Sequence, residues 1–272
     1  TAPGLYYKAG NKSFFALPGV PIELQYIFEN SIMAILQRNY PSKPLIQKTL
    51  HTWGISESAL AERLADFIPP SSVNMAWLPQ TGRVDLRFYG NDSTAINQVA
   101  GIILETIEDV VWGVDDDTPF SVLHKILISQ KKTISVAESC TGGLIQQSMT
   151  ELPGSSKYLL GGVIAYSNDI KLRLLHVPQE VLENAGAVSM ECAAAMAYGI
   201  KDLTNSEVAI SMTGIAGPEG GSVEKPVGSV FFGIADDTGV YTSGQIFTGN
   251  RKSIRLKAAE FVVLKLIEKL RG

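Results

Sequence analysis

The sequence predicts an α/β protein. Its C-terminal part is expected to form a three-layer α/β/α sandwich with a mixed, mostly parallel sheet, preceded by a small α+β unit. The first observation is that strand-like and helix-like segments alternate from Thr118 onward, which is typical of such a sandwich. The second is a shorter β-α-β-β-α order before it, ending near residues 115–117. At 272 residues the chain is long enough for more than one domain.

The composition is that of an ordinary globular protein, with 45% hydrophobic and 18% charged residues. No apolar run is long enough to span a membrane, and the given sequence does not start with a positively charged stretch followed by an apolar signal core. The formal net charge of −4 does not indicate a nucleic-acid or anionic-membrane binder. Two cysteines, Cys140 and Cys192, cannot build a disulfide framework, so we expect a cytoplasmic protein.

The first forty residues resemble a piece of a larger α/β unit. A strand is expected over Ser13–Leu17, a turn over residues 18–21 and a helix over Glu23–Gln37. One strand and one helix cannot bury a core alone. The chain begins with Thr1 rather than Met, so we expect a processed product or fragment that lacks the beginning of its first domain.

Pro41 and Pro44 mark the start of the α+β unit. Alternating, capping and turn patterns predict a strand over Leu45–Trp53, a helix from the N-cap Ser56 to Phe67, strands over Asn74–Leu78 and Arg83–Tyr89 joined by a turn at residues 79–82, and a long helix capped by Asn91 or Asp92.

The sandwich is predicted in the same way. We expect helices over Pro119–Ser129, from the Thr141–Gly143 turn to Pro153, over Asp169–His176, after Ser189 and from Asn250, and strands over Thr133–Ala137, Gly162–Tyr166, Glu207–Met212, Val227–Ala235 and Val240–Phe247, the last two forming a hairpin.

Candidate chemistry lies after these strands, because sites in open α/β sheets gather at the carboxyl ends of the strands. Ser139 falls where a strand turns into a helix, so its hydroxyl can project into a cleft as a nucleophile. The amides of Thr141, Gly142 and Gly143 would then be free to stabilise an oxyanion. The alternative is that Ser139 or Thr141 only caps the helix.

A serine nucleophile needs a base, and Lys171 is the candidate. Asp169 or Asn168 is expected to cap a short helix with Lys171 in its first turn, where the helix dipole and burial both favour a neutral amine. Tyr166 could relay the proton or orient the lysine. Alternatively, Lys171 is a solvated surface lysine.

Cys140 is the rival nucleophile, although a buried, inert cysteine explains it as well. The glycine-rich segment Thr213–Gly221 follows a strand and could approach a ligand with its backbone, or be an ordinary surface loop. Arg251, at the start of the last helix, could pair with a phosphate or form a surface salt bridge. Three histidines far apart in the sequence give no pattern for a metal site.

Several motifs in order resemble the C-terminal domain of the competence/damage-inducible CinA family and the stand-alone nicotinamide-nucleotide amidases (PncC-like). The matching stretches are AESCTGG at residues 137–143, YSNDIK at 166–171, GAVS at 186–189, TGIAGPEGG followed by KPVG at 213–228, and the step from Gly249 to Arg251.

The front of the chain resembles the same family. Residues 1–40 are similar to the end of its molybdopterin-binding-like N-terminal domain, residues 41–117 to its KH-like linker domain and residues 118–272 to its amidase domain. The glycine-rich nucleotide loop and acidic metal-binding residues of the N-terminal domain have no counterpart here, so its ADP-ribose pyrophosphatase activity is not expected.

The resemblance implies hydrolysis of nicotinamide mononucleotide to nicotinic acid mononucleotide and ammonia, without metal or organic cofactor. Ser139, Lys171 and Tyr166 match the nucleophile, base and helper. The expected substrate-binding residues are Glu138, Cys140, Thr141, Gly142, Gly143, Thr213, Gly214, Ala216, Gly217, Gly220 and Arg251. The expected partner is the small-molecule substrate, and a homodimer is expected.

Two other functions compete with hydrolysis. A KH-like unit suggests RNA binding, but residues 43–117 carry five basic and eleven acidic side chains, a balance of −6, and lack a Gly-x-x-Gly loop. We therefore interpret this unit as a spacer or dimer-forming module and expect no nucleic-acid partner. The second alternative is a catalytically inactive domain that binds a nucleotide or acts as a scaffold in competence or the DNA-damage response.

Overall fold

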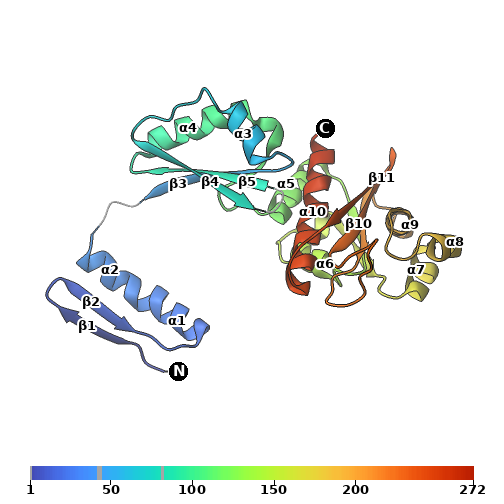
Figure 1. The fold of residues 1–272 in the computed structure, drawn as a ribbon, viewed down its shortest axis with the longest axis horizontal. Coiled ribbons are helices and arrows are strands. Elements are labelled where there is room, and N and C mark those ends of the chain that lie inside the picture. Colours follow the sequence, from blue (N-terminus) through green and yellow to red (C-terminus); the bar gives the residue numbers. More distant parts are fainter. Residues whose placement is uncertain (1, 42–44, 81–82) are drawn as a thin grey trace.

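The computed structural model describes residues 2–41, 45–80 and 83–272, which contain three sheets that follow one another along the chain (Figure 1). They have two, four and five strands. The α/β class and the C-terminal sandwich predicted from the sequence are confirmed. Within the described residues, no helix is both long and apolar enough to cross a membrane.

The N-terminal sheet is a hairpin of β1 (Leu5–Ala9) and β2 (Lys12–Ala16). Two helices follow, α1 (Pro21–Ile27) and α2 (Met33–Asn39), joined by one π-helical stretch. The strand β1 was missed from the sequence. Among residues 2–41 only Ile32 is buried, which fits the argument that so few elements cannot build a core.

The second sheet is antiparallel, with strands in the order β4-β5-β3-β6. Its elements are β3 (Ile46–Thr52), α3 (Glu57–Arg63), β4 (Val73–Gln80), β5 (Arg83–Gly90), α4 (Ser93–Thr106) and β6 (Val111–Val114). The helix α4 buries Ile96, Val99 and Ile103 in the core of this unit. Two details differ from the sequence prediction: β6 is an additional strand, and α3 ends before Phe67. Of the two predicted N-caps of α4, Asn91 and Asp92, the structure has Asp92. The expected turn includes residues 81–82, which lie outside the described residues.

The C-terminal sheet has the order β11-β10-β9-β7-β8. Its strands are β7 (Ile134–Glu138), β8 (Leu159–Ile164), β9 (Val208–Gly214), β10 (Ser229–Asp236) and β11 (Gly239–Ile246). The strand β7 pairs in parallel with β8 and β9, whereas β10 runs antiparallel to both of its neighbours. Four strands therefore share one direction, as predicted.

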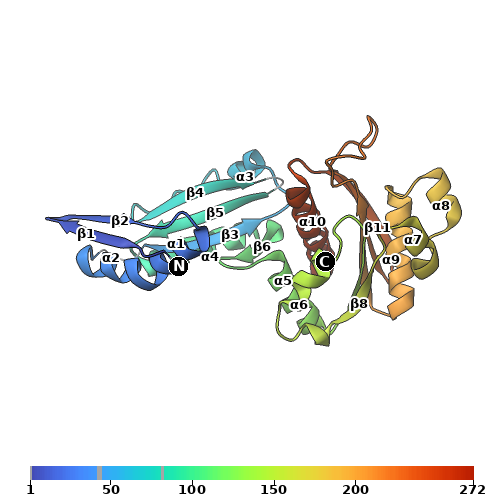
Figure 2. The same cartoon turned by 90° about the horizontal axis from the view of Figure 1, so that it is seen from below.

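Helices cover both faces of this sheet (Figure 2). On one face lie α5 (Pro119–Gln130), α6 (Leu144–Thr150) and α10 (Arg251–Arg271), and on the other α7 (Asn168–Leu175), α8 (Gln179–Asn184) and α9 (Met190–Thr204). Successive side chains of a strand alternate between faces. Large residues of β9 therefore face α10, while its small Ala209 and Ser211 face α9, and the Ser211 hydroxyl donates to the Ala193 carbonyl at 2.5 Å.

Three local differences from the sequence prediction matter for function. The helix α6 begins at Leu144, three residues later than expected, so Ser139 to Gly143 form a turn. The strand β8 ends at Ile164, so Ala165 and Tyr166 lie in the loop before α7. The helix α8 was not predicted, and it places the segment from Ala185 to Ser189 between α8 and α9.

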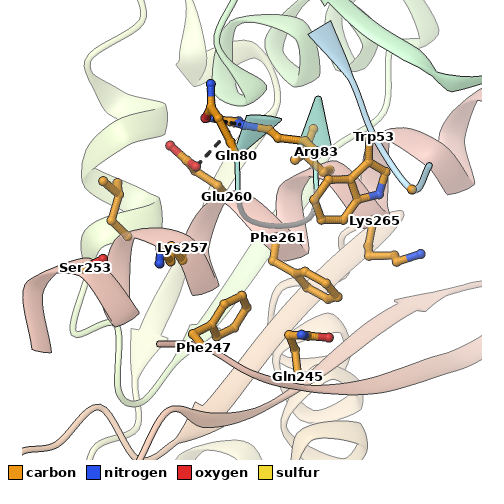
Figure 3. A pocket seen from close by; sticks show the side chains of 13 residues that line it. Trp53, Gln80, Arg83, Gln245, Phe247, Ser253, Lys257, Glu260, Phe261 and Lys265 are labelled. Carbon is orange, nitrogen blue, oxygen red and sulfur yellow. Dashed lines mark hydrogen bonds and ion pairs between the residues drawn. The ribbon is translucent and has the colours of Figure 1, made fainter. Parts of the chain in front are cut away.

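The middle unit and the C-terminal sandwich pack together through α10. Arg271 donates to the carbonyls of Val111 (2.7 Å) and Trp112 (3.0 Å) on β6. Trp53 meets Phe261 edge-on, with ring centroids 5.4 Å apart. An ion pair of 3.8 Å joins Arg83 Nη1 to a Glu260 carboxylate oxygen (Figure 3).

Candidate active site

Two cavities are candidates for the site. The larger, about 740 Å³, lies at the junction with the middle unit and is drawn in Figure 3. Its lysines are already engaged, since Lys257 donates to the Thr248 carbonyl at 2.8 Å and Lys265 pairs with Glu268 at 2.9 Å. The smaller cavity, about 170 Å³, contains both the predicted nucleophile and the predicted base. We therefore place the chemistry in the smaller one.

The smaller cavity opens beyond the carboxyl ends of β7, β8 and β9, where a parallel sheet is expected to hold its ligand. It is lined by Ser139, Cys140, Tyr166, Asn168, Lys171, Ala187, Val188, Thr213, Gly214, Ala216 and Arg251. All three predicted catalytic side chains therefore line one cavity, Ser139 from the turn after β7, Tyr166 from the loop after β8 and Lys171 from α7. Asn168, Ala187 and Val188 were not singled out from the sequence, although they fall in the YSNDIK and GAVS stretches.

Ser139 is the first residue after β7 and is 7% exposed. Its amide donates to the Met212 carbonyl on β9 at 3.1 Å, which fixes the backbone of the turn. Its Oγ lies 3.3 Å from Lys171 Nζ. Neither Ser139 nor Thr141 caps α6: the N-cap is Gly143, and the Thr141 hydroxyl is buried with no hydrogen-bond partner among the described residues. The capping alternative is therefore wrong.

Lys171 lies in the first turn of α7 and is only 1% exposed, so the solvated-surface alternative is also wrong. Ser167, not Asp169 or Asn168, is the N-cap, because its hydroxyl accepts the Ile170 amide proton. Burial lowers the pKa of Lys171 below its ordinary value, because desolvation disfavours the ammonium. The thiols of Cys192 and Cys140 act weakly in the opposite direction.

The three contacts of Lys171 can be made by an ammonium or by a neutral amine, and only the neutral amine can act as a base. Nζ donates to the carbonyls of Ala165 at 2.7 Å and Tyr166 at 3.3 Å, and its third contact is Ser139 Oγ. A neutral amine has two N–H bonds and one lone pair. If the two carbonyls accept both hydrogens, the lone pair faces the serine hydroxyl, which is the arrangement that a general base requires.

Tyr166 was expected to relay the proton or to orient Lys171, and its backbone and side chain behave differently in the structure. Its backbone carbonyl helps to orient Lys171, but its side chain is 63% exposed and its hydroxyl lies 3.3 Å from an Arg251 nitrogen. Among the described residues, no hydrogen bond joins the phenol to Ser139 or Lys171. The geometry therefore supports the orienting role through the backbone and gives no support to a proton relay.

Cys140 lines the cavity but is only 6% exposed. Burial raises the pKa of its thiol to about 11, with a smaller contribution in the same direction from the Glu138 carboxylate. Because the thiolate is the nucleophilic form, this cysteine is unreactive near neutral pH. The arrangement favours Ser139 as the nucleophile.

The turn after Ser139 is held by two charged side chains that the prediction did not use in this way. The Glu138 carboxylate, fully buried, accepts the amides of Gly143 (2.8 Å), Ile145 (3.3 Å) and Gln146 (3.0 Å), as helix N-termini favour. Arg255 on α10 donates through Nε (3.2 Å) and an Nη to the Thr141 carbonyl. Glu138 is thus a structural anchor that does not line the cavity, and its role in substrate binding stays a prediction.

The expected oxyanion donors also need correction. The Gly142 amide donates to the Ser139 carbonyl at 3.1 Å, and the Gly143 amide is taken by Glu138. Both glycines have positive φ (60° and 93°), which lets the chain turn sharply here. Among the described residues, no hydrogen bond uses the amides of Cys140 and Thr141, which are the free donors of this turn. Thr141, Gly142 and Gly143 do not line the cavity.

The glycine-rich segment contributes Thr213, Gly214 and Ala216 to the cavity, so part of it is more than an ordinary surface loop. The Gly217 carbonyl accepts a hydrogen bond from Arg251 Nη1 at 2.7 Å, which holds the guanidinium at the cavity rim and replaces the expected salt bridge. Gly217 and Gly220 do not line the cavity. Within the described residues, no cluster of three or more His, Cys, Asp or Glu could hold a metal ion.

Family models match most of the chain. The CinA C-terminal domain matches residues 117–270, and the damage-inducible protein CinA KH domain matches residues 47–113. A CinA-like protein from Syntrophomonas wolfei is 39% identical over 269 residues, covering 96% of this chain and 65% of the relative. A putative competence-damage inducible protein from Halothermothrix orenii is 38% identical, covering 94% and 63%. The chain thus spans about two thirds of the length of these relatives.

Solved structures agree with the domain matches. The CinA superfamily protein KP700603 from Klebsiella pneumoniae superposes with a TM-score of 0.55 at 31% identity, covering 56% of this chain and 96% of that structure. The competence/damage inducible protein CihA from Agrobacterium tumefaciens gives a TM-score of 0.54 at 36% identity, covering 57% and 98%.

Proposed function

The chain belongs to the CinA family, and on that premise we propose that residues 118–272 form an amidohydrolase that converts nicotinamide mononucleotide to nicotinic acid mononucleotide and ammonia. The observation that carries the proposal is the Ser139–Lys171 pair, with 3.3 Å between Oγ and Nζ and a buried lysine whose pKa is lowered. The division of the chain at about residues 40 and 117 into a remnant, a KH-like unit and the amidase is part of this proposal.

The proposed reaction begins when Ser139 Oγ attacks the carboxamide carbon while its proton passes to Lys171 Nζ. The tetrahedral adduct collapses, the C–N bond breaks, and Lys171 returns the proton to the departing nitrogen, which leaves as ammonia. Water then attacks the acyl ester and gives its proton to Lys171. As the ester C–O bond breaks, Lys171 passes that proton to Ser139 Oγ, which releases the free acid and restores the serine hydroxyl and the neutral amine. Each cycle consumes one amide and one water.

The size of the cavity supports partial enclosure of the substrate. Its volume of about 170 Å³ is below the roughly 300–1,000 Å³ of pockets that enclose a whole drug-sized ligand. We propose that the pyridine ring and carboxamide enter it, while the ribose phosphate stays at the rim. Arg251 lies there and is exposed, so part of its guanidinium can pair with phosphate.

The test is release of ammonia from nicotinamide mononucleotide by the purified chain, with no added metal. Ser139→Ala should abolish turnover, whereas Cys140→Ser, one residue away in the same cavity, should retain most of it. The reverse result would make the cysteine the nucleophile. A folded wild-type protein that binds the nucleotide without turnover would instead support the inactive, binding-only alternative.

A further inference from the structure

The segment from Ala185 to Ser189 forms one wall of the cavity. It connects α8 to α9. Ala187 and Val188 line the cavity together with Ser139. This segment has no regular structure of its own, so other parts of the chain must fix its backbone.

Three of its carbonyl groups are held from outside the segment, while the Gly186 carbonyl accepts from the Ser189 hydroxyl within it. The Thr213 hydroxyl donates to the Ala187 carbonyl at 2.6 Å. Lys225 Nζ donates to the carbonyls of Ala185 at 3.0 Å and Val188 at 2.7 Å. Ala185 is the C-cap of α8, and a cation is favourable at a helix C-terminus. Lys225 therefore joins the end of α8 to the residue before the N-cap of α9.

Lys225 can act as a fixed anchor because its own loop is closed. The Gly228 amide donates to the Ile215 carbonyl at 2.7 Å at the base of the loop. Near the lysine, the Ser222 amide donates to the Lys225 carbonyl at 2.9 Å, and the Lys225 amide donates to the Ser222 hydroxyl at 3.0 Å. The base of this loop is also attached to β9 and β10, which carry Thr213 and Ser229.

Anchoring the carbonyls sets the direction of the neighbouring amides. In a trans peptide the C=O of one residue and the N–H of the next point in opposite directions. The bond from Thr213 to the Ala187 carbonyl therefore turns the Val188 amide away from Thr213. Among the described residues no hydrogen bond uses this amide, whereas the Gly142 and Gly143 amides are occupied.

We propose that Lys225 is a positioning residue of the hydrolase: by holding the Ala185 and Val188 carbonyls it keeps the Ala187–Val188 wall, and the Val188 amide, at the carboxamide end of the cavity. This inference rests on the proposed amidase function. Misplacing a substrate by about 1 Å costs on the order of 100-fold in rate. Loss of Lys225 should therefore reduce kcat more than KM, because the phosphate contact proposed for Arg251 is untouched.

The experiment compares wild type with Lys225→Met and with the control Lys201→Met. Lys201 makes an ion pair of 2.8 Å to Asp237 at the opposite end of the sheet, where β10 ends beside the start of β9. We expect Lys225→Met to lower kcat for nicotinamide mononucleotide about 100-fold with KM within about 3-fold of wild type. Lys201→Met should match wild type in both parameters.

Hydrogen–deuterium exchange is the second readout and does not depend on activity. Residues 185–189 should exchange faster in Lys225→Met, while residues 139–143 should exchange as in wild type. A kcat within about 3-fold of an active wild type, unchanged exchange of residues 185–189, or equal loosening of both segments would overturn the positioning role. If wild type releases no ammonia, the proposed function fails, and the exchange comparison alone decides whether Lys225 orders the wall.

Discussion

Replacing Lys171 tests the proposed mechanism most directly. Lys171→Met keeps the length and apolar volume of the side chain but removes the amine that lies 3.3 Å from Ser139 Oγ. General-base catalysis contributes roughly 10²–10⁴-fold to rate. Since Lys171 serves in both acylation and deacylation, we expect kcat/KM to fall at least ~10³-fold, equivalent to about 4 kcal/mol of transition-state stabilisation. Lys171→Arg should be equally inactive, because a guanidinium stays protonated.

The assay is coupled detection of ammonia released from nicotinamide mononucleotide between pH 6 and pH 10. For wild type, kcat/KM should rise with pH as Lys171 loses its proton, because the neutral amine is the base. Burial lowers the pKa of Lys171, so the rise should be centred below the ordinary lysine value of about 10.4. Either a rise centred at the ordinary value or a Lys171→Met variant retaining a tenth of wild-type activity would refute the reasoning.

Three further substitutions separate the neighbouring roles. Cys140→Ser should retain at least about half of wild-type activity, and iodoacetamide at pH 7 should not label Cys140 in the folded protein, because its thiol pKa is about 11. Glu138→Gln should lower the free energy of unfolding by roughly 2–3 kcal/mol in urea titrations, since three backbone amides lose a buried carboxylate. Arg251→Met should raise KM for nicotinamide mononucleotide about 10-fold with little change in kcat, and should leave turnover of free nicotinamide, which has no phosphate, unaffected.

Local patterns predicted most of the regular elements and the two side chains of the proposed reacting pair. Ser139 and Lys171 follow neighbouring parallel strands, β7 and β8, whose carboxyl ends meet at one edge of the sheet. Because sites gather at the carboxyl ends of parallel strands, the direction of the strands alone predicts that the segments following β7 and β8 lie together. The four-residue strand β6 was missed because so short a segment shows no clear alternation.

The supporting contacts were missed for a different reason. Glu138 bonds to amides five, seven and eight residues ahead, beyond the reach of the usual capping patterns. Arg255 meets Thr141 across 114 residues, and Lys225 meets Ala185 across 40. Such contacts depend on how distant segments pack, and no periodicity or motif in one sequence encodes them. The resemblance identified the stretches but not the tasks of their charged residues.

The burial of Lys171 opposes the stability of the fold. Because its pKa is lower in the folded chain than in the unfolded one, the unfolded chain binds more protons between the two values. The free energy of unfolding therefore rises with pH through that window, and the full penalty is present below the folded pKa. A core position 1% exposed would be better filled by an apolar side chain. A buried lysine with two carbonyls arranged for its hydrogens and a serine hydroxyl at its third site is what the proposed catalysis requires and packing does not.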